Sequence, residues 1–218
     1  MDIRERFTDR ADAGGRLAAR VVQLGLTRPV VLALPRGGLP VGEPVAAGLG
    51  SPLEVFVARK IPAPGHPEVA VGAVAEGGEP WLSAELLRRV GARPEEVEPA
   101  VARERAELDR RVREYRGDRA LPALPGADVV VVDDGLATGA TARAALVALR
   151  ARHPRRLVLA VPVLPKEAMA NLRELADDVV AVLTPSPMRA VSLWYDRFGQ
   201  LTDDDVRAVL ERHPGGAT

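Results

Sequence analysis

Hydrophobic residues follow two periods along the chain, and their alternation predicts an α/β fold. Apolar runs short enough to be buried strands occur at 29–34, 53–60, 129–132, 156–164 and 178–183. Helical spacing of apolar residues occurs at 8–24, 39–49 and 165–176, in a segment ending at Arg152 and after Thr202. Strands separated by helices of this length predict right-handed crossovers, and therefore a central, mostly parallel sheet flanked by helices.

Two segments depart from this alternation. The stretch 61–80 is dense in Pro and Gly and too long for a simple connection, so we predict a mobile lid there, with a short strand in VGAVAE. The stretch 83–117 is helical and highly charged, with a narrow apolar stripe. This insertion either packs on the domain or forms a dimer arm, and its arginines are expected to face solvent because acids are interleaved among them.

Composition narrows the class of protein without choosing a function. With 218 residues the chain is long enough for one sizeable core, or for a core with a small flap. The absence of cysteine excludes disulfides, thiolate metal sites and a cysteine nucleophile. The 30 basic and 30 acidic residues cancel, so we expect no nucleic-acid partner and no electrostatic membrane anchor. The sequence shows neither an apolar signal core nor a membrane-spanning run, so we expect a cytoplasmic protein.

The segment from Val129 to Leu146 carries the chemistry around which the rest of the chain can be arranged. Its valine run is typical of a central parallel strand, and ligands bind at the carboxyl ends of such strands, where Asp133 and Asp134 fall. Their carboxylates can accept hydrogen bonds from vicinal ribose hydroxyls. The small residues that follow let N–H groups and hydroxyls converge on an anion, which predicts a 5'-phosphate site at Ala137, Thr138, Gly139, Ala140 and Thr141.

This segment is similar to the phosphoribosyl pyrophosphate (PRPP) binding motif of type I phosphoribosyltransferases. The match runs from Val129 to Thr141 and consists of a hydrophobic run, two acids, three residues and then Thr-Gly-x-Thr. The alternative is a Rossmann-like or P-loop turn with incidental acids, but neither GxGxxG nor GxxxxGK[ST] is present. The resemblance implies the type I fold as a single domain over 1–218, with a small flap and a hood at about 184–200.

The resemblance also implies a pyrophosphate subsite at the ends of two other strands. In the family, the loop after the first core strand contacts pyrophosphate, and Arg36, Gly37 and Gly38 match it here. A basic residue just after a later strand is a further contact in several members. This points to Lys60 first and Arg59 second, because neighbouring strand residues face opposite sides. The alternatives are a tight turn that needs its glycines only for packing, and a solvated strand end.

The base pocket and the general base are less directly marked. In purine phosphoribosyltransferases an aromatic and an acidic residue near the C-terminus help to form the base pocket, and Trp194, Tyr195 and Asp196 resemble that arrangement. The alternative is an aromatic plug that seals the core or a subunit interface. Ala137 stands where 6-oxopurine enzymes carry an aspartate, so the motif is closer to the adenine and orotate types. Glu76 in the lid is our hypothesis for the base.

The function that the resemblance implies is Mg²⁺-dependent transfer of the 5-phosphoribosyl group of PRPP to a nitrogenous, purine-like base, with release of pyrophosphate. Asp133, Asp134 and Glu76 are its candidate catalytic residues, and Mg²⁺ is expected to be held through PRPP, with the two aspartates as candidate protein contacts. We expect a homodimer that acts in nucleotide metabolism. One different function is a non-catalytic PRPP-binding regulator with the same fold, and another is an interaction module built on the charged helices.

Overall fold

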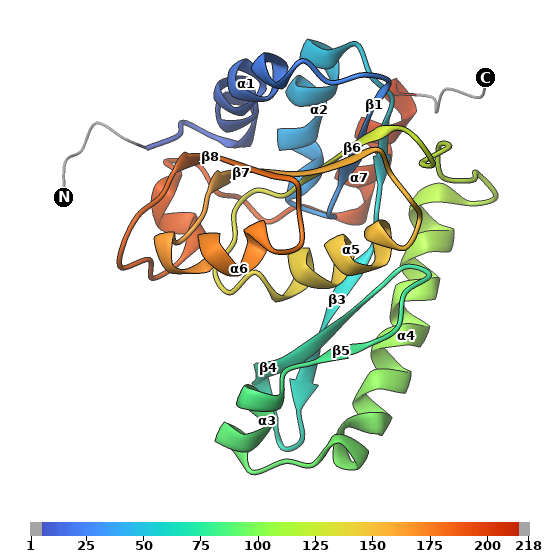
Figure 1. Cartoon of the computed structure of the whole chain (residues 1–218), viewed down its shortest axis with the longest axis vertical. Helices are drawn as coiled ribbons and strands as arrows, with labels where there is room; N and C mark the ends of the chain where they lie inside the picture. The colour runs from blue at the N-terminus through green and yellow to red at the C-terminus, as the bar shows by residue number, and fades with distance from the viewer. Residues whose placement is uncertain (1–5, 214–218) are drawn as a thin grey trace.

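Five parallel strands form the central sheet in a computed structural model that describes residues 6–213 (Figure 1). All neighbouring pairs are parallel. The order across the sheet is β2 (Leu53–Val55), β1 (Pro29–Ala33), β6 (Asp128–Val132), β7 (Arg156–Val163) and β8 (Asp178–Leu183). The predicted α/β class with a parallel central sheet is therefore confirmed.

The valine run of β6 is buried on both faces of the sheet, which explains its continuous apolar sequence. Val130 and Val132 belong to the core beneath α1 (Arg10–Val21) and α2 (Gly38–Leu49). Val129 and Val131 belong to the opposite core, beneath α5 (Ala140–Arg150) and α6 (Met169–Arg173). Figure 1 shows the two helical layers on opposite sides of the sheet.

Side-chain caps mark the start of the first and of the last helix. Asp9 caps α1 by accepting from the N–H of Asp12, and Thr202 forms a capping box with Asp205 at the start of α7 (Asp203–Arg212). Short 3-10 helices occur at η1 (Val22–Leu24), η2 (Lys166–Ala168) and η3 (Val191–Trp194). The helix predicted at 165–176 is shorter than expected, because its first part is η2 and α6 ends at Arg173.

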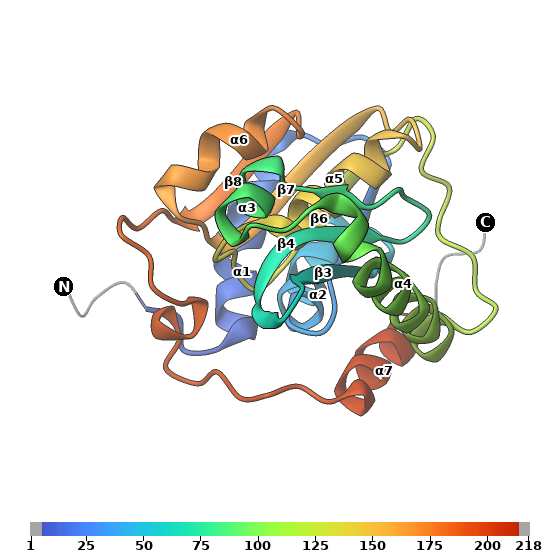
Figure 2. The same ribbon diagram turned by 90° about the horizontal axis from the view of Figure 1, so that it is seen from below.

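A small antiparallel sheet with two helices extends from one end of the central sheet. We call this part the small unit; it consists of β3 (Ala58–Ala63), β4 (His66–Ala75), β5 (Trp81–Leu82), α3 (Ala84–Val90) and α4 (Pro94–Arg116). Figure 2 shows the molecule from below, that is, from the end at which the small unit lies in Figure 1. The predicted irregular lid at 61–80 is therefore wrong in its conformation, because most of that stretch forms a paired hairpin.

The apolar stripe of α4 packs within the chain, on β3 and on α7, and buries Val97, Leu108 and Tyr115. Its other faces carry ion pairs such as that between Arg111 and Glu107 at 2.8 Å. Of the two predicted arrangements for the charged helical insertion, the structure shows the one in which it packs on the domain.

The single strand predicted at 53–60 is wrong, because the chain leaves one sheet and enters another within it. β2 ends at Val55 and β3 starts at Ala58, and the buried residues Phe56 and Val57 lie between them. The N–H of Phe56 donates to Ala33 O at 2.9 Å, whereas Val57 O accepts from Glu76. Because the residues on both sides of the transition are buried, the hydrophobic pattern continues through it and does not indicate where one strand ends and the next begins.

A buried ion pair fastens the small unit to the central sheet. Arg116, at the end of α4, donates to both carboxylate oxygens of Glu76 and to the carbonyl of Val55. The side chains of Arg116 and Glu76 are only 7% and 11% exposed. One guanidinium thus connects the ends of α4, β4 and β2.

We expect Arg116→Ala to lower the free energy of unfolding by about 3–5 kcal/mol, because removing one partner leaves a buried charge uncompensated. Urea denaturation would measure the loss. Arg110→Ala is the matched control, since Arg110 lies on the same helix and its ion pairs are exposed to solvent; its effect should be small. Replacing both Arg116 and Glu76 by methionine should recover much of the stability, and equal losses for the two alanine variants would contradict this account.

Candidate functional site

The loops after β1 and β6 meet at the carboxyl edge of the central sheet. The N–H of Leu34 donates to Val132 O at 2.8 Å, which continues the pairing beyond β1. A Cβ atom on Gly38 would lie 2.5 Å from Val132 O, and one on Gly37 would collide with the carboxylate of Asp134. Both glycines are therefore required by the close approach of the two loops, which brings the PRGG segment against the acidic pair.

The segment 137–141 turns directly into the N-terminus of α5. Gly139 precedes the first helical residue with a φ of 74°, in the left-handed region. The exposed Thr138 accepts a hydrogen bond from the N–H of Ala140 at 3.5 Å. Because the first N–H groups of a helix have no partner within it, this turn can present N–H donors and hydroxyls to an anion.

Asp133 and Asp134 lie between β6 and this turn, partly exposed. Asp133 accepts from the N–H of Asp134 at 2.8 Å, and Asp134 accepts from Arg10 Nε at 2.8 Å. Burial, together with the charge of Asp134, raises the pKa of Asp133 well above its usual range. Burial also raises the pKa of Asp134, and the hydrogen bond and charge of Arg10 oppose that shift. Both acids therefore favour a cation or hydrogen-bond donor beside them.

Arg10, the first residue of α1, contacts the acidic pair, although sequence analysis did not select it as a site residue. Its guanidinium lies 3.8 Å from the ring centre of Phe198 and donates to Gly199 O at 3.0 Å. These contacts hold it against Asp134, where both side chains are largely buried. Arg10 falls outside the apolar stripe of its helix, so the local sequence does not distinguish it from arginines that face solvent.

The aromatic cluster near the C-terminus packs as a plug beside the acidic pair. Tyr195 is 2% exposed, and its ring lies 5.3 Å from Phe7 and 4.9 Å from Phe198 between ring centres. Its hydroxyl donates to Asp134 O at 2.5 Å, and burial raises its pKa. Asp196 is exposed and pairs with Arg6 at 3.4 Å. Of the predicted base-binding residues, Tyr195 therefore seals the structure beneath the site and offers no open stacking face.

The predicted cations point in different directions. Lys60 faces a cavity beside residues 137–141, which we call the phosphate turn after its predicted ligand, and the charge of Lys60 works against the raised pKa of Asp133. Arg59 faces the other side of β3 and pairs with Glu104 at 2.6 Å. Arg36 lies 3.4 Å from Asp203 and donates to a carbonyl beside α7. The structure thus brings Lys60 to the site, while Arg59 and Arg36 are held by acids elsewhere.

Glu76 lies outside the cavity, contrary to our hypothesis that it is the general base. The residue is 8% exposed, and its carboxylate is bonded by Arg116. The hypothesis assumed a mobile loop, but β4 is ordered up to Ala75 and directs Glu76 into the junction between the small unit and the sheet.

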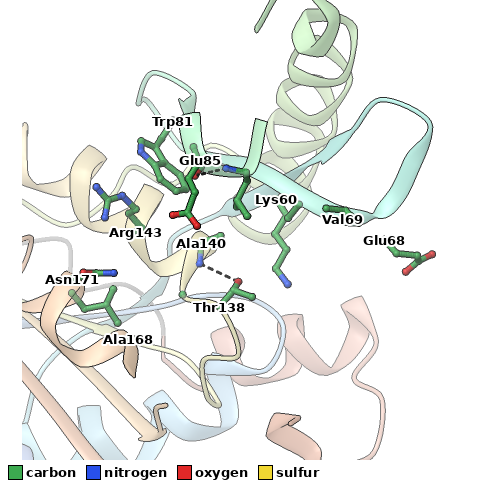
Figure 3. Close-up of a pocket in the computed structure, with 15 residues that line it drawn as sticks. Lys60, Glu68, Val69, Trp81, Glu85, Thr138, Ala140, Arg143, Ala168 and Asn171 are labelled. Carbon is green, nitrogen blue, oxygen red and sulfur yellow. Dashed lines mark hydrogen bonds between the residues drawn. The ribbon is translucent and has the colours of Figure 1, made fainter. Parts of the chain in front are cut away.

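A cavity of about 580 Å³ separates the phosphate turn from the small unit (Figure 3). Lys60, Thr138 and Ala140 line one part of it. Its other walls come from residues that sequence analysis did not select, namely Trp81, Ser83, Glu85, Arg143 and Asn171. Trp81 and Arg143 lie more than sixty positions apart in the chain, so only the fold brings them together.

Comparison with known proteins agrees with this arrangement. A family model described as the phosphoribosyl transferase domain matches residues 5–188. The chain belongs to this family. The crystal structure of TT1426 from Thermus thermophilus is 47% identical, covers 95% of this chain and 99% of that chain, and has a TM-score of 0.81. The phosphoribosyltransferase fold predicted from the motif is therefore confirmed.

More distant and longer relatives set the limits of the comparison. A protein of Mycobacterium tuberculosis that is provisionally named a phosphoribosyl transferase is 42% identical over 206 residues, which is 94% of this chain. This chain spans only 46% of that relative. A hypothetical protein of Neisseria gonorrhoeae, solved with bound ppGpp, is 15% identical, covers 93% of this chain and 92% of its own, has a TM-score of 0.54, and shows the fold alone.

Two further observations apply to residues 6–213. Within them, no helix is both long and apolar enough to cross a membrane. The same residues contain no group of three or more His, Cys, Asp or Glu side chains arranged to hold a metal ion.

We expect Asp133→Asn to raise the free energy of unfolding at neutral pH by about 1 kcal/mol. The raised pKa means that the folded protein keeps a proton that the unfolded chain releases above about pH 4. Stability therefore falls as pH rises through this window, and the variant escapes the loss. Asparagine also keeps the acceptor for the N–H of Asp134.

Melting temperatures measured between acidic and neutral pH would test this effect. The gain should shrink as the pH approaches about 4, where Asp133 is protonated in both states. Asp118→Asn, at an exposed position after α4, is the control and should behave like the wild type throughout. A variant less stable than the wild type at neutral pH would contradict the raised pKa.

Proposed function

We propose that the protein transfers the 5-phosphoribosyl group of PRPP to a nitrogenous base and releases pyrophosphate. The observation that carries this proposal is the contact between the PRGG loop and Asp134, which follow two neighbouring strands of the sheet, β1 and β6. It aligns a turn suited to a phosphate at 137–141, two carboxylates suited to sugar hydroxyls, and a glycine loop open to a diphosphate. A sugar with phosphate at one end and diphosphate at the other uses all three.

The acidic pair also suits Mg²⁺, which prefers oxygen ligands and is commonly bound by one or two carboxylates together with substrate phosphates. Asp133 and Asp134 would hold it, and when bound it would spread the charge that develops on the leaving diphosphate. The remaining work is positioning: Thr138 and Thr141 fix the phosphate end, the carboxylates orient the ribose hydroxyls, and Lys60 supplies positive charge.

The acceptor that we favour is a purine-like base, and its support is the family resemblance of the motif with Ala137. Trp194 and Asp196 remain the candidate contacts, since Tyr195 is enclosed. A non-catalytic PRPP-binding regulator is our second proposal. One observation favours it: Glu76, our candidate for the base, is bound to Arg116 away from the cavity.

Incubation with Mg·PRPP and a panel of purine and pyrimidine bases, followed by measurement of pyrophosphate release, tests the proposal. We expect release with at least one base. The double variant Asp133→Ala, Asp134→Ala should lose both release and the rise in melting temperature that Mg·PRPP gives the wild type. Thr138→Ala should weaken binding about tenfold or more, because a hydrogen bond to a charged group is lost.

Thr27→Ala is the matched control, because Thr27 is exposed at the opposite, amino-terminal end of β1. Binding without release for every base would favour the regulator. Equal stabilisation of the double variant and the wild type by Mg·PRPP would refute the assignment of the acidic pair.

A further inference from the structure

Arg143 lines the cavity, and no acidic side chain within residues 6–213 pairs with it. Its backbone N–H donates to Gly139 O at 2.8 Å, so it belongs to the first turn of α5, directly after the phosphate turn. Helical side chains lean toward the N-terminus of their helix, which inclines this guanidinium toward the turn. Within the described part of the chain it forms no ion pair, and its buried Nε has no hydrogen-bond partner. A partly enclosed cation is thus left uncompensated beside an anion-binding turn.

Trp81, which belongs to the small unit, contacts this guanidinium. The centre of the guanidinium lies 4.7 Å from the centre of the Trp81 ring, as a cation–π contact. Figure 3 shows the two side chains next to each other on the wall of the cavity. A cation–π contact holds a guanidinium near the ring without an acceptor for its N–H groups, which stay available for a planar or tetrahedral oxyanion.

The acids of the cavity do not neutralise Arg143. Glu85 is exposed and pairs instead with Arg89, at 3.2 Å and one helical turn away on α3. Glu68 is exposed, and no ion pair joins it to Arg143 among the residues that the structure describes. The phosphate turn itself supplies only neutral donors, so the charge of a phosphate dianion seated there must be balanced by other groups.

We propose that Arg143 is an additional ligand for the phosphate monoester that binds the turn at 137–141, and that Trp81 is the positioning residue that orients it. This inference rests on the proposed function for the place of the phosphate. It follows that the small unit takes part in phosphate binding, because Trp81 on β5 orients the guanidinium of Arg143 on α5.

Fluorescence offers a direct test, because the chain has two tryptophans and Trp194→Phe leaves Trp81 as the only one, so that selective excitation of tryptophan reports on Trp81 alone. In that background, ribose 5-phosphate and inorganic phosphate should change the emission of Trp81 in a saturable way, whereas ribose should not. Arg143→Ala should weaken ribose 5-phosphate binding by about ten- to a hundredfold, since a charge-assisted hydrogen bond is lost. Arg143→Lys should lie in between, because it keeps the charge without the fork.

Calorimetric titration extends the test to Trp81, whose substitution removes the fluorescent reporter. Trp81→Leu should weaken ribose 5-phosphate binding, and Trp81→Phe should restore it, because a phenyl ring keeps the stacking face. Arg150→Ala is the matched control: Arg150 lies on the same helix but pairs with Asp177 away from the cavity. Melting temperatures of all variants, with the lysine and phenylalanine variants as the mildest changes, separate lost binding from lost folding.

The outcomes distinguish this inference from the function on which it rests. If Arg143→Ala binds ribose 5-phosphate like Arg150→Ala while Thr138→Ala binds it weakly, the role of Arg143 is refuted and the phosphate turn stands. If the wild type binds neither ribose 5-phosphate nor inorganic phosphate, the role of Arg143 is refuted, and pyrophosphate release from Mg·PRPP decides the proposed function separately. If Arg143→Ala weakens binding and Thr138→Ala does not, the anion lies away from the turn, which overturns the shared site.

Discussion

The loop after β1 can lie against the carboxylate of Asp134 only because Gly37 has no side chain, and the rest of the candidate site depends on that approach. Parallel neighbours in a sheet bring their carboxyl ends to one edge, but ordinary side chains would keep the two loops apart. Because Gly37 and Gly38 both lack a side chain, the backbone of the loop after β1 packs directly against the loop after β6. The loop that we propose for the diphosphate and the acid pair that we propose for the sugar can then contact a single small ligand.

This closeness has an electrostatic cost, which the surrounding residues reduce. Burial raises the pKa values of both Asp133 and Asp134, and the charge of Asp134 raises the pKa of Asp133 further. Arg10 contacts Asp134 directly, and the charge of Lys60 lowers the pKa of Asp133. Two cations from distant elements therefore partly offset the cost of ionising these acids. A bound cation or hydroxyl donor would stabilise the carboxylates further. Such strain is expected where binding, rather than stability, has shaped the residues.

Local patterns were sufficient to predict four of the five strands of the central sheet, and the strand, turn and helix of the motif. The valines of β6 and the helix after Gly139 lie where their spacing predicts them. Prediction failed where the decisive contact is distant. The ordered hairpin at 61–80 depends on pairing between β3 and β4, and the position of Glu76 depends on Arg116, forty residues away. Arg10 and Trp81 belong to the site through contacts that no spacing rule describes.

The small unit gains a different meaning from these contacts. A mobile lid would need only to cover the ligand, whereas this unit is fastened by the buried pair between Arg116 and Glu76 and faces the phosphate turn with Lys60 and Trp81. On β3, the alternation of side chains turns Arg59 toward Glu104 of α4 and leaves Lys60 free for the cavity. The same strand thus fixes the unit with one cation and serves the site with the next. Positioning of charge by a rigid neighbour suits a reaction in which the protein mainly orients and stabilises its substrate.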